Sequence, residues 1–198
     1  MHELYSSKEA LDEAIRSGST SGDMDETFNQ LDQLLADLSI HALDLVLSDT
    51  PISPGVKVRA FNHLLGECDV TVFATAAQAE TYRHNFPRSL HDAPFLLPTQ
   101  GTALRRSLEQ WFEAEHIHPA VAAEVEDMAL LQVLGQEGLG LFAAPTVVED
   151  EIRRQYRVEP VGRIAAVRER FYAISIDRKL KHPAVLAISK AAKGTLFS

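Results

Sequence analysis

Three strand-then-helix units lie in succession between residues 93 and 156, and this succession constrains the fold most. Apolar runs of strand length cover residues 93–97, 121–125 and 139–143. Apolar residues at helical spacing follow each run, over residues 102–115, 127–135 and 145–156. Strands that alternate with helices of this length predict an α/β fold with mostly parallel sheets and helices on the sheet faces.

The flanking segments add strands and helices at both ends. Short apolar runs predict strands at residues 43–48, 56–65, 70–74, 158–161 and 171–176, with Gly66-Glu67 between the second and the third. His182-Pro183 opens a last helix. Residues 1–30 differ from the rest, because their pattern predicts helices joined by the linker-like stretch Gly18–Gly22.

The composition argues against a chain that binds DNA by itself. The 198 residues carry 19 Lys and Arg against 28 Asp and Glu, a net charge of −9. A DNA-binding domain needs a concentrated basic surface, so another segment or chain would have to make any DNA contact. Cys68 is the one cysteine, which excludes an internal disulfide. With no signal-peptide pattern and no long apolar run, we expect a cytoplasmic chain without a membrane partner.

The loops at the carboxyl ends of the predicted strands hold the candidate binding residues, because ligands bind there in open α/β sheets. Two of these loops lead into helix N-termini, whose free N–H groups suit an anion or a polar oxygen. Thr99, Gln100 and Thr102 could supply hydrogen bonds there. The alternative is that Thr99 and Asp127 only cap helices. The loops are Asp49-Thr50-Pro51, Pro98-Thr99-Gln100-Gly101 and Glu126-Asp127-Met128.

The motifs of common enzyme classes are absent. The chain has no G-x-S-x-G elbow, no G-x-x-x-x-G-K-[ST] phosphate loop and no H-E-x-x-H, so we expect a protein that is not an enzyme. The glycine-rich stretch Gly135–Gly140 is explained by a helix stop and a tight turn. His116 and His118 could bind a metal, but exposure at a helix end is the simpler interpretation. Cys68, between two acidic neighbours, is expected to have a raised pKa and low reactivity.

Several segments, in order, resemble the effector-binding domain of LysR-type transcriptional regulators. The amino-acid sequences of the segments most resemble those of the branch that responds to sodium and activates sodium/proton antiporter genes. The segments are Leu31-Asp-Gln-Leu-Leu-Ala-Asp-Leu38, Leu43-Asp-Leu-Val-Leu-Ser-Asp-Thr-Pro51, Phe61-Asn-His-Leu-Leu-Gly66, Ala93-Pro-Phe-Leu-Leu-Pro98, Glu126-Asp127-Met128, Val133-Leu-Gly-Gln-Glu-Gly-Leu-Gly140 with Pro145, Arg170-Phe-Tyr-Ala-Ile-Ser175 and His182-Pro-Ala-Val185.

The resemblance implies two lobes of the periplasmic-binding-protein type with an effector cleft between them. Residues 31–74 and 172–198 would form lobe one, and residues 75–171 would form lobe two. The chain would cross between the lobes near residues 72–74 and 172–174. Residues 1–30, an atypical helical segment with a linker, replace the strand, helix and strand that open the family's domain, which would leave lobe one incomplete.

The resemblance also implies an effector and its contacts. The implied effector is Na⁺ or Li⁺, a hard cation that prefers oxygen ligands, and Asp49 and Asp127 are the carboxylates best placed to offer them. No cofactor is expected. Effector binding would favour a closed arrangement of the lobes and shift the population toward it. The expected effector-binding residues are Asp49, Thr50, Thr99, Gln100, Thr102, Asp127 and Met128.

DNA binding and assembly would depend on the rest of such a regulator. The family places a helix-turn-helix and a long linker helix before this domain, and the sequence contains neither. DNA would be a partner only through such a segment, and we expect a homodimer or tetramer of the full-length protein.

Two other classes of protein stay open. A periplasmic-type solute-binding protein would need an export signal, and a small-molecule enzyme would need a nucleophile or a paired acid and base.

Overall fold

The structure is a computed structural model of the chain. It describes residues 34–38, 40, 42–52, 59–178, 186, 187, 190–192 and 194. The helices and linker predicted for residues 1–30, the loop at residues 53–55 and the helix start at His182-Pro183 lie outside the described residues.

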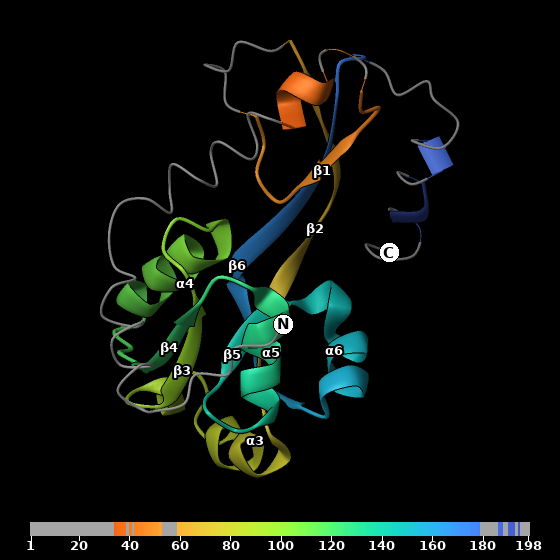
Figure 1. The fold of residues 1–198 in the computed structure, drawn as a ribbon. Coiled ribbons are helices and arrows are strands. Elements are labelled where there is room, and N and C mark those ends of the chain that lie inside the picture. The colour runs from red at the N-terminus through yellow and green to blue at the C-terminus, as the bar shows by residue number, and fades with distance from the viewer. Residues whose placement is uncertain are drawn as a thin grey trace, which may run out of the picture.

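Two long antiparallel strands run through the molecule. β2 (Phe61–Ala74) pairs with β6 (Glu159–Ser175) along almost its whole length. β1 (Val46–Ser48) joins the outer edge of β6, and β5 (Phe142–Pro145) joins that of β2, both antiparallel. Figure 1 shows β2 and β6 running from an upper part, which contains β1, to a lower part that contains α3 to α6. The two strands therefore connect two groups of elements.

The lower part contains the three predicted strand–helix units. β3 (Pro94–Pro98) and β4 (Ala120–Val125) are parallel, and Phe95 forms a parallel bridge to Leu141 just before β5. None of the described helices is long and apolar enough to cross a membrane. The helices are α3 (Ala76–Arg83), α4 (Ala103–Ala114), α5 (Met128–Gln136) and α6 (Glu149–Tyr156), with short 3₁₀ turns η1 (Arg88–Leu90) and η2 (Thr146–Val148).

The strand directions are more mixed than the predicted mostly parallel sheets. β3 and β4 are parallel, as strand–helix units require. The pairs of β2 with β6 and β5, and of β6 with β1, are antiparallel. The mixture arises because both long strands pass between the two parts in opposite directions, which the local strand–helix pattern does not report.

Several predicted short strands merge into the long ones. β2 continues through Gly66-Glu67, where we expected a break, and β6 joins the strands predicted at residues 158–161 and 171–176. The polar residues between them pair across the strands, for example Glu67 with Arg170. Register shifts at Leu64/Gly66 and at Asp69/Val70 keep the pairing intact where the chain is irregular.

The observed bounds of other strands and helices differ from the predicted ones by a few residues. β1 includes only the end of the run 43–48, and β5 begins at Phe142 instead of residue 139. The helix expected from residue 145 begins at Glu149 because residues 146–148 form the 3₁₀ turn η2.

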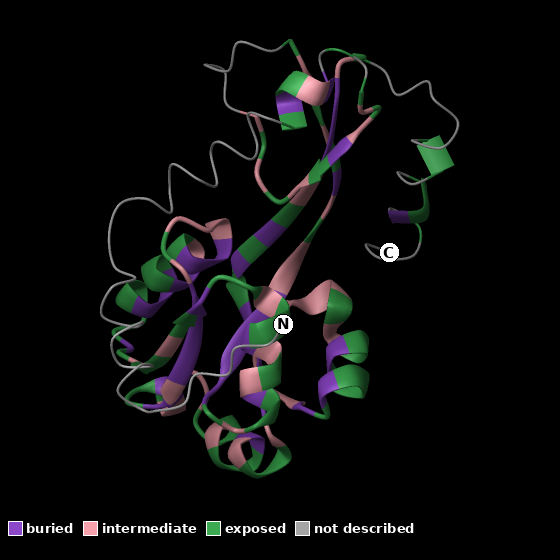
Figure 2. Ribbon diagram, in the orientation of Figure 1, coloured by how far each residue is buried: buried purple, intermediate pink, exposed green. Residues whose placement is uncertain are grey.

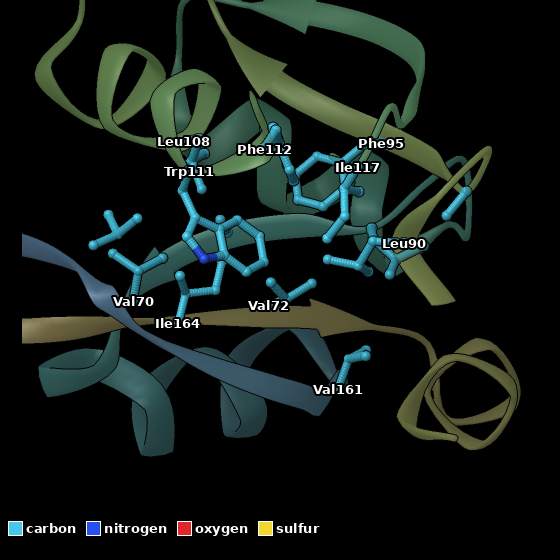
Figure 3. Close-up of a cluster of buried hydrophobic side chains, with 14 of the residues drawn as sticks. Val70, Val72, Leu90, Phe95, Leu108, Trp111, Phe112, Ile117, Val161 and Ile164 are labelled. Carbon is cyan, nitrogen blue, oxygen red and sulfur yellow. The ribbon is translucent and has the colours of Figure 1, made fainter. Parts of the chain in front are cut away.

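The larger core lies in the lower part and has a layer on each face of the sheet. On one face, Trp111 and Phe112 of α4 pack over Val70 and Val72 of β2, and Figure 3 shows both aromatic side chains above these strands. Phe112 contacts Phe95 with ring centroids 5.4 Å apart. Because side chains alternate along a strand, the next residue, Phe73, faces the other layer, which α5 and α6 cover.

A smaller core lies at the other end of the long strands. Leu35 and Leu38 pack with Val46 of β1 and Ile174 of β6, while Leu65 of β2 packs with Ala173. Figure 2 shows the end of β2 in the lower part as buried, whereas residues 61–69 of β2 are mostly half-buried or exposed.

We define the crossing segment as residues 66–69 of β2 with residues 168–171 of β6, which pair between the two cores. On β2 this segment precedes Val72 and Ala74, which belong to the larger core, and the predicted crossings near residues 72–74 and 172–174 stay predictions. The predicted lobe limits at residues 74/75 and 171/172, and the separate segment 1–30, stay predictions.

Gly140 lies where β3 approaches the chain before β5. A Cβ atom there would be 2.9 Å from the Pro94 carbonyl oxygen, which accepts a 2.8 Å hydrogen bond from the Leu141 N–H. We therefore expect Gly140→Ala to lower the free energy of unfolding by about 1–3 kcal/mol, measured by urea denaturation. Gly194→Ala is the matched control, since beyond its chain neighbours no atom of the described residues lies within 4 Å of its added Cβ. Equal stability of the two variants would contradict the close approach.

Candidate functional site

The loops after β3 and β4 bring most of the candidate residues to one edge of the sheet. Parallel strands place their carboxyl ends side by side, and the Thr99 N–H donates a 3.2 Å hydrogen bond to the Val125 carbonyl. Gln100 is exposed, and Met128 is half-buried against both layers of the larger core. The residues at this edge are Thr99, Gln100, Thr102, Asp127 and Met128.

Two of these residues cap the helices that begin here. The Thr102 hydroxyl accepts a 3.2 Å hydrogen bond from the Arg105 N–H and donates to the Thr99 carbonyl at 3.3 Å. The Asp127 carboxylate accepts a 2.8 Å hydrogen bond from the Leu130 N–H at the start of α5. The capping alternative is therefore confirmed for Asp127, and Thr102, not Thr99, caps α4 with its side chain. Their role in effector binding stays a prediction.

A buried arginine supports this edge from behind. Arg105 is 5% exposed, and its guanidinium donates to the Pro98 carbonyl at 2.9 Å, to Glu124 at 2.8 Å and to Glu109 at 2.6 Å. The three acceptors come from β3, β4 and α4, so one side chain ties the ends of both strands to the helix. The burial of Arg105 could not be predicted from the sequence, because a charged residue beside Leu104 on an amphipathic helix gives no signal of burial.

The other two candidates lie in a hydrogen-bonded turn after β1. The Ser48 hydroxyl accepts from the Thr50 N–H at 3.0 Å and donates to the Thr50 carbonyl at 2.8 Å. The Thr50 hydroxyl in turn donates to the Asp49 carboxylate at 3.1 Å. Because β1 runs antiparallel to β6, with Ser48 opposite Tyr172, the chain leaves β1 toward the crossing segment.

Glu169 is the acidic group that this turn approaches. The residue is only 5% exposed, and burial, followed by the negative charge of Asp49, raises the pKa of its carboxyl to about 7. Cys68 lies opposite it on β2. Burial is also the main cause that raises the pKa of the Cys68 thiol, so the predicted direction is confirmed, although we attributed it to acidic neighbours alone.

Glu169 differs from its two arginine neighbours in the face that it occupies. The guanidinium of Arg168 pairs with Glu67 at 2.9 Å and with Asp69, and that of Arg170 pairs with Glu67 at 3.1 Å. Both arginines are exposed, whereas Val167 and Glu169 are buried. Strand alternation thus sends the positive charges to one side of the crossing segment and Glu169 to the other. Glu169 lies two residues after Val167 on the same strand, so both side chains share one face. This spacing was the sequence signal of burial that we missed.

The two candidate histidines lie at the surface. His116 and His118 are exposed, as expected at a helix end, and the His118 ring meets that of His91 at 5.5 Å between centroids. No group of three or more His, Cys, Asp or Glu side chains within the described ranges could hold a metal ion.

We predict that the stability of the domain falls as the pH rises from about 5 to about 8, by at most about 1.4 kcal/mol per pH unit from Glu169. Its pKa, about 7 when folded against an ordinary 4.5, means that the folded state holds the proton longer. The favourable contribution is complete below the unfolded pKa and is lost as the pH passes the folded one. Urea denaturation across this range should show that Glu169→Gln flattens the decline, while the exposed control Glu113→Gln does not.

Asp127→Ala should lower the free energy of unfolding by about 1 kcal/mol, because the Leu130 N–H loses its side-chain acceptor. Asp127→Asn, which keeps an acceptor oxygen, is the control for thermal or urea denaturation. A loss of equal size in both variants would argue against capping.

Comparison with known proteins agrees with this architecture. The pattern of the LysR substrate binding domain matches residues 25–196. The chain is 32% identical to the transcriptional activator protein NhaR of Escherichia coli (strain K12) over 167 residues, which are 84% of this chain and 54% of NhaR. It thus spans about half the length of the curated relatives it matches.

Solved regulatory domains have the same fold. The reduced regulatory domain of OxyR2 from Vibrio vulnificus superposes with a TM-score of 0.62 at 14% identity, over 83% of this chain and 77% of that one. For the CcmR regulatory domain of Synechocystis PCC6803 the TM-score is 0.57 at 12% identity, over 83% and 79%. These neighbours have the two-lobed periplasmic-binding-protein-like fold, so the predicted α/β class and plan are confirmed. The chain belongs to the LysR family of transcriptional regulators, and it carries their effector-binding domain.

Proposed function

We propose that the chain senses a small effector for a transcriptional activator and reports it through the relative arrangement of its two cores. The observation that carries this proposal is that both cores are built on the same two strands, β2 and β6. A change in the crossing segment would move one core relative to the other, while each core keeps its own packing.

The expected effector contacts come from both ends of the long strands. Asp49 and Thr50 follow β1 beside the smaller core, whereas Thr99 and Asp127 lie in loops at the edge of the sheet beside the larger core. An effector that contacts both groups would bind one arrangement of the cores better than another and shift the population toward it. The structure of the CcmR regulatory domain in complex with 2-PG supports a small effector for this fold.

For the effector itself we propose Na⁺ or Li⁺, on the resemblance to the sodium-responsive branch of the family. Carboxylate and hydroxyl oxygens suit such hard cations. The turn Ser48-Asp49-Thr50 presents both kinds, and Asp49 is exposed. Asp127 is the second expected carboxylate.

The remaining parts of the proposal concern the whole regulator. The net charge of −9 supports DNA contact through a helix-turn-helix segment outside this domain. A homodimer or tetramer in the bacterial cytoplasm is the form in which such a regulator would act. The match over residues 25–196 favours a regulator over both a solute-binding protein and an enzyme.

We expect NaCl or LiCl to raise the melting temperature of the chain more than KCl at the same ionic strength, because a ligand that binds only the folded state stabilises it. Differential scanning fluorimetry with matched chloride concentrations measures this, with choline chloride as the control for ionic strength. Identical melting curves in all four salts would refute the sodium or lithium effector.

A further inference from the structure

Four charged side chains join β2 to β6 within the crossing segment. Glu67 lies opposite Arg170 in the strand register. Asp69 lies opposite Arg168 in the same way, so each acid faces a base across the two strands. The Arg168 guanidinium contacts Glu67 at 2.9 Å as well as Asp69, and the Arg170 guanidinium contacts Glu67 at 3.1 Å. We call these four residues the crossing ion pairs, and because they share partners they form one network.

The strand pairing is irregular on both sides of the crossing ion pairs. Toward the smaller core, Leu65 is left out of the register of β2 with β6. Toward the larger core, residues 165–167 of β6 are left out of the register with β2. Extra residues of this kind interrupt the ladder and bend the strand that contains them. The crossing segment is therefore a short block of regular pairing with an irregular joint at each end.

The apolar packing of both cores stops on either side of the crossing ion pairs. The larger core reaches Val70 of β2 and Val167 of β6, and the smaller core reaches Leu65 and Phe171. On the face of the crossing ion pairs, charged side chains thus take the place of apolar contacts between the strands. These side chains are between 28% and 57% exposed, so dissolved ions can screen the attraction between them.

We propose that the crossing ion pairs form a clamp that limits the movement of one core relative to the other and that weakens as the ionic strength rises. Isolated surface pairs contribute little, but a network of shared partners holds its members in one geometry. The Debye length falls from about 30 Å at 0.01 M salt to about 3 Å at 1 M, so any salt weakens the clamp. This inference goes beyond the proposed effector response, since the clamp needs neither a bound effector nor a particular cation.

Hydrogen exchange of the full chain, followed by mass spectrometry in about 20 mM and about 500 mM KCl, tests the clamp. Amides of the crossing segment should exchange about three- to tenfold faster at the higher concentration, because screened pairs oppose local opening less. Arg168→Gln removes the contacts with Glu67 and Asp69, so its crossing segment should exchange fast at both concentrations. The matched control Arg163→Gln removes a pair with Glu149 on the same strand and should keep the wild-type salt dependence.

Inversion of all four charges separates their mutual attraction from other effects of the side chains. The combined variant keeps opposite charges facing each other across the strands, so it should regain the salt dependence that Arg168→Gln lacks. Its substitutions are Glu67→Arg, Asp69→Arg, Arg168→Glu and Arg170→Glu.

The distance between two spin labels reports the arrangement of the cores. Asp44→Cys beside the smaller core and Glu113→Cys on α4 replace exposed residues, and Cys68→Ser removes the native thiol. Electron paramagnetic resonance should show a distribution of label distances that broadens at the higher KCl concentration. With Arg168→Gln added, the distribution should be broad at both concentrations.

Three results would overturn the proposal. The first is a salt dependence of exchange in Arg168→Gln equal to that of the wild type. The second is an unchanged distribution of label distances despite faster exchange, which would leave the crossing ion pairs a purely local role. The third is a change that NaCl or LiCl produces and equimolar KCl or choline chloride does not, since such a change would belong to the proposed effector response. Identical changes in all four salts support the clamp, even if the sodium or lithium effector is refuted.

Discussion

The pairing of β2 with β6 is the interaction on which the rest of the structure depends. Val70 and Val72 of β2 and Ile164 of β6 support the larger core, and residues further along the same strands support the smaller one. Because each strand belongs to both cores, neither core can close without this ladder. Register shifts lie at both ends of the crossing segment, and a further one lies within the larger core, between Val72 and Phe73.

Because side chains alternate along a strand, the charged residues of the crossing segment lie on two opposite faces. Arg168 and Arg170 meet Glu67 and Asp69 on one face, where water already lowers the cost of every charge. Glu169 lies on the other face beside Asp49, where burial makes its charge costly. The segment through which any movement between the cores must pass therefore also contains a buried carboxyl whose pKa is raised to about 7.

The parts of the structure that depend on local periodicity could be predicted from the sequence. The strand–helix units at β3–α4 and β4–α5 were predicted because apolar residues such as Leu104 and Leu108 repeat at helical spacing. The same topology grouped Thr99, Thr102 and Asp127 at one edge. The long strands were missed because Gly66-Glu67 and the polar residues before Phe171 look like breaks, and only pairing across about a hundred residues of chain makes them continuous.

The candidate site shows the same limit. Asp49 and Thr50 could be named as candidates because a loop after a strand is a local signal, and their role stays a prediction. Glu169 and Arg105 were not, because burial of a charged residue follows from which distant segments cover it. Single-sequence patterns identify polar residues in loops, but they do not identify which charged residues the folded chain buries.

Arg168, Arg170, Glu67 and Asp69 form ion pairs at the surface of the crossing segment. Dissolved ions of any kind screen such surface pairs, since the Debye length is about 8 Å at physiological ionic strength. Screening depends on the ionic strength and not on which monovalent salt is present. The opposite face of the same ribbon is shielded from it, because Glu169 is buried. Ionic strength therefore acts mainly on one face of the crossing segment, whereas on the other face Glu169 responds to the pH.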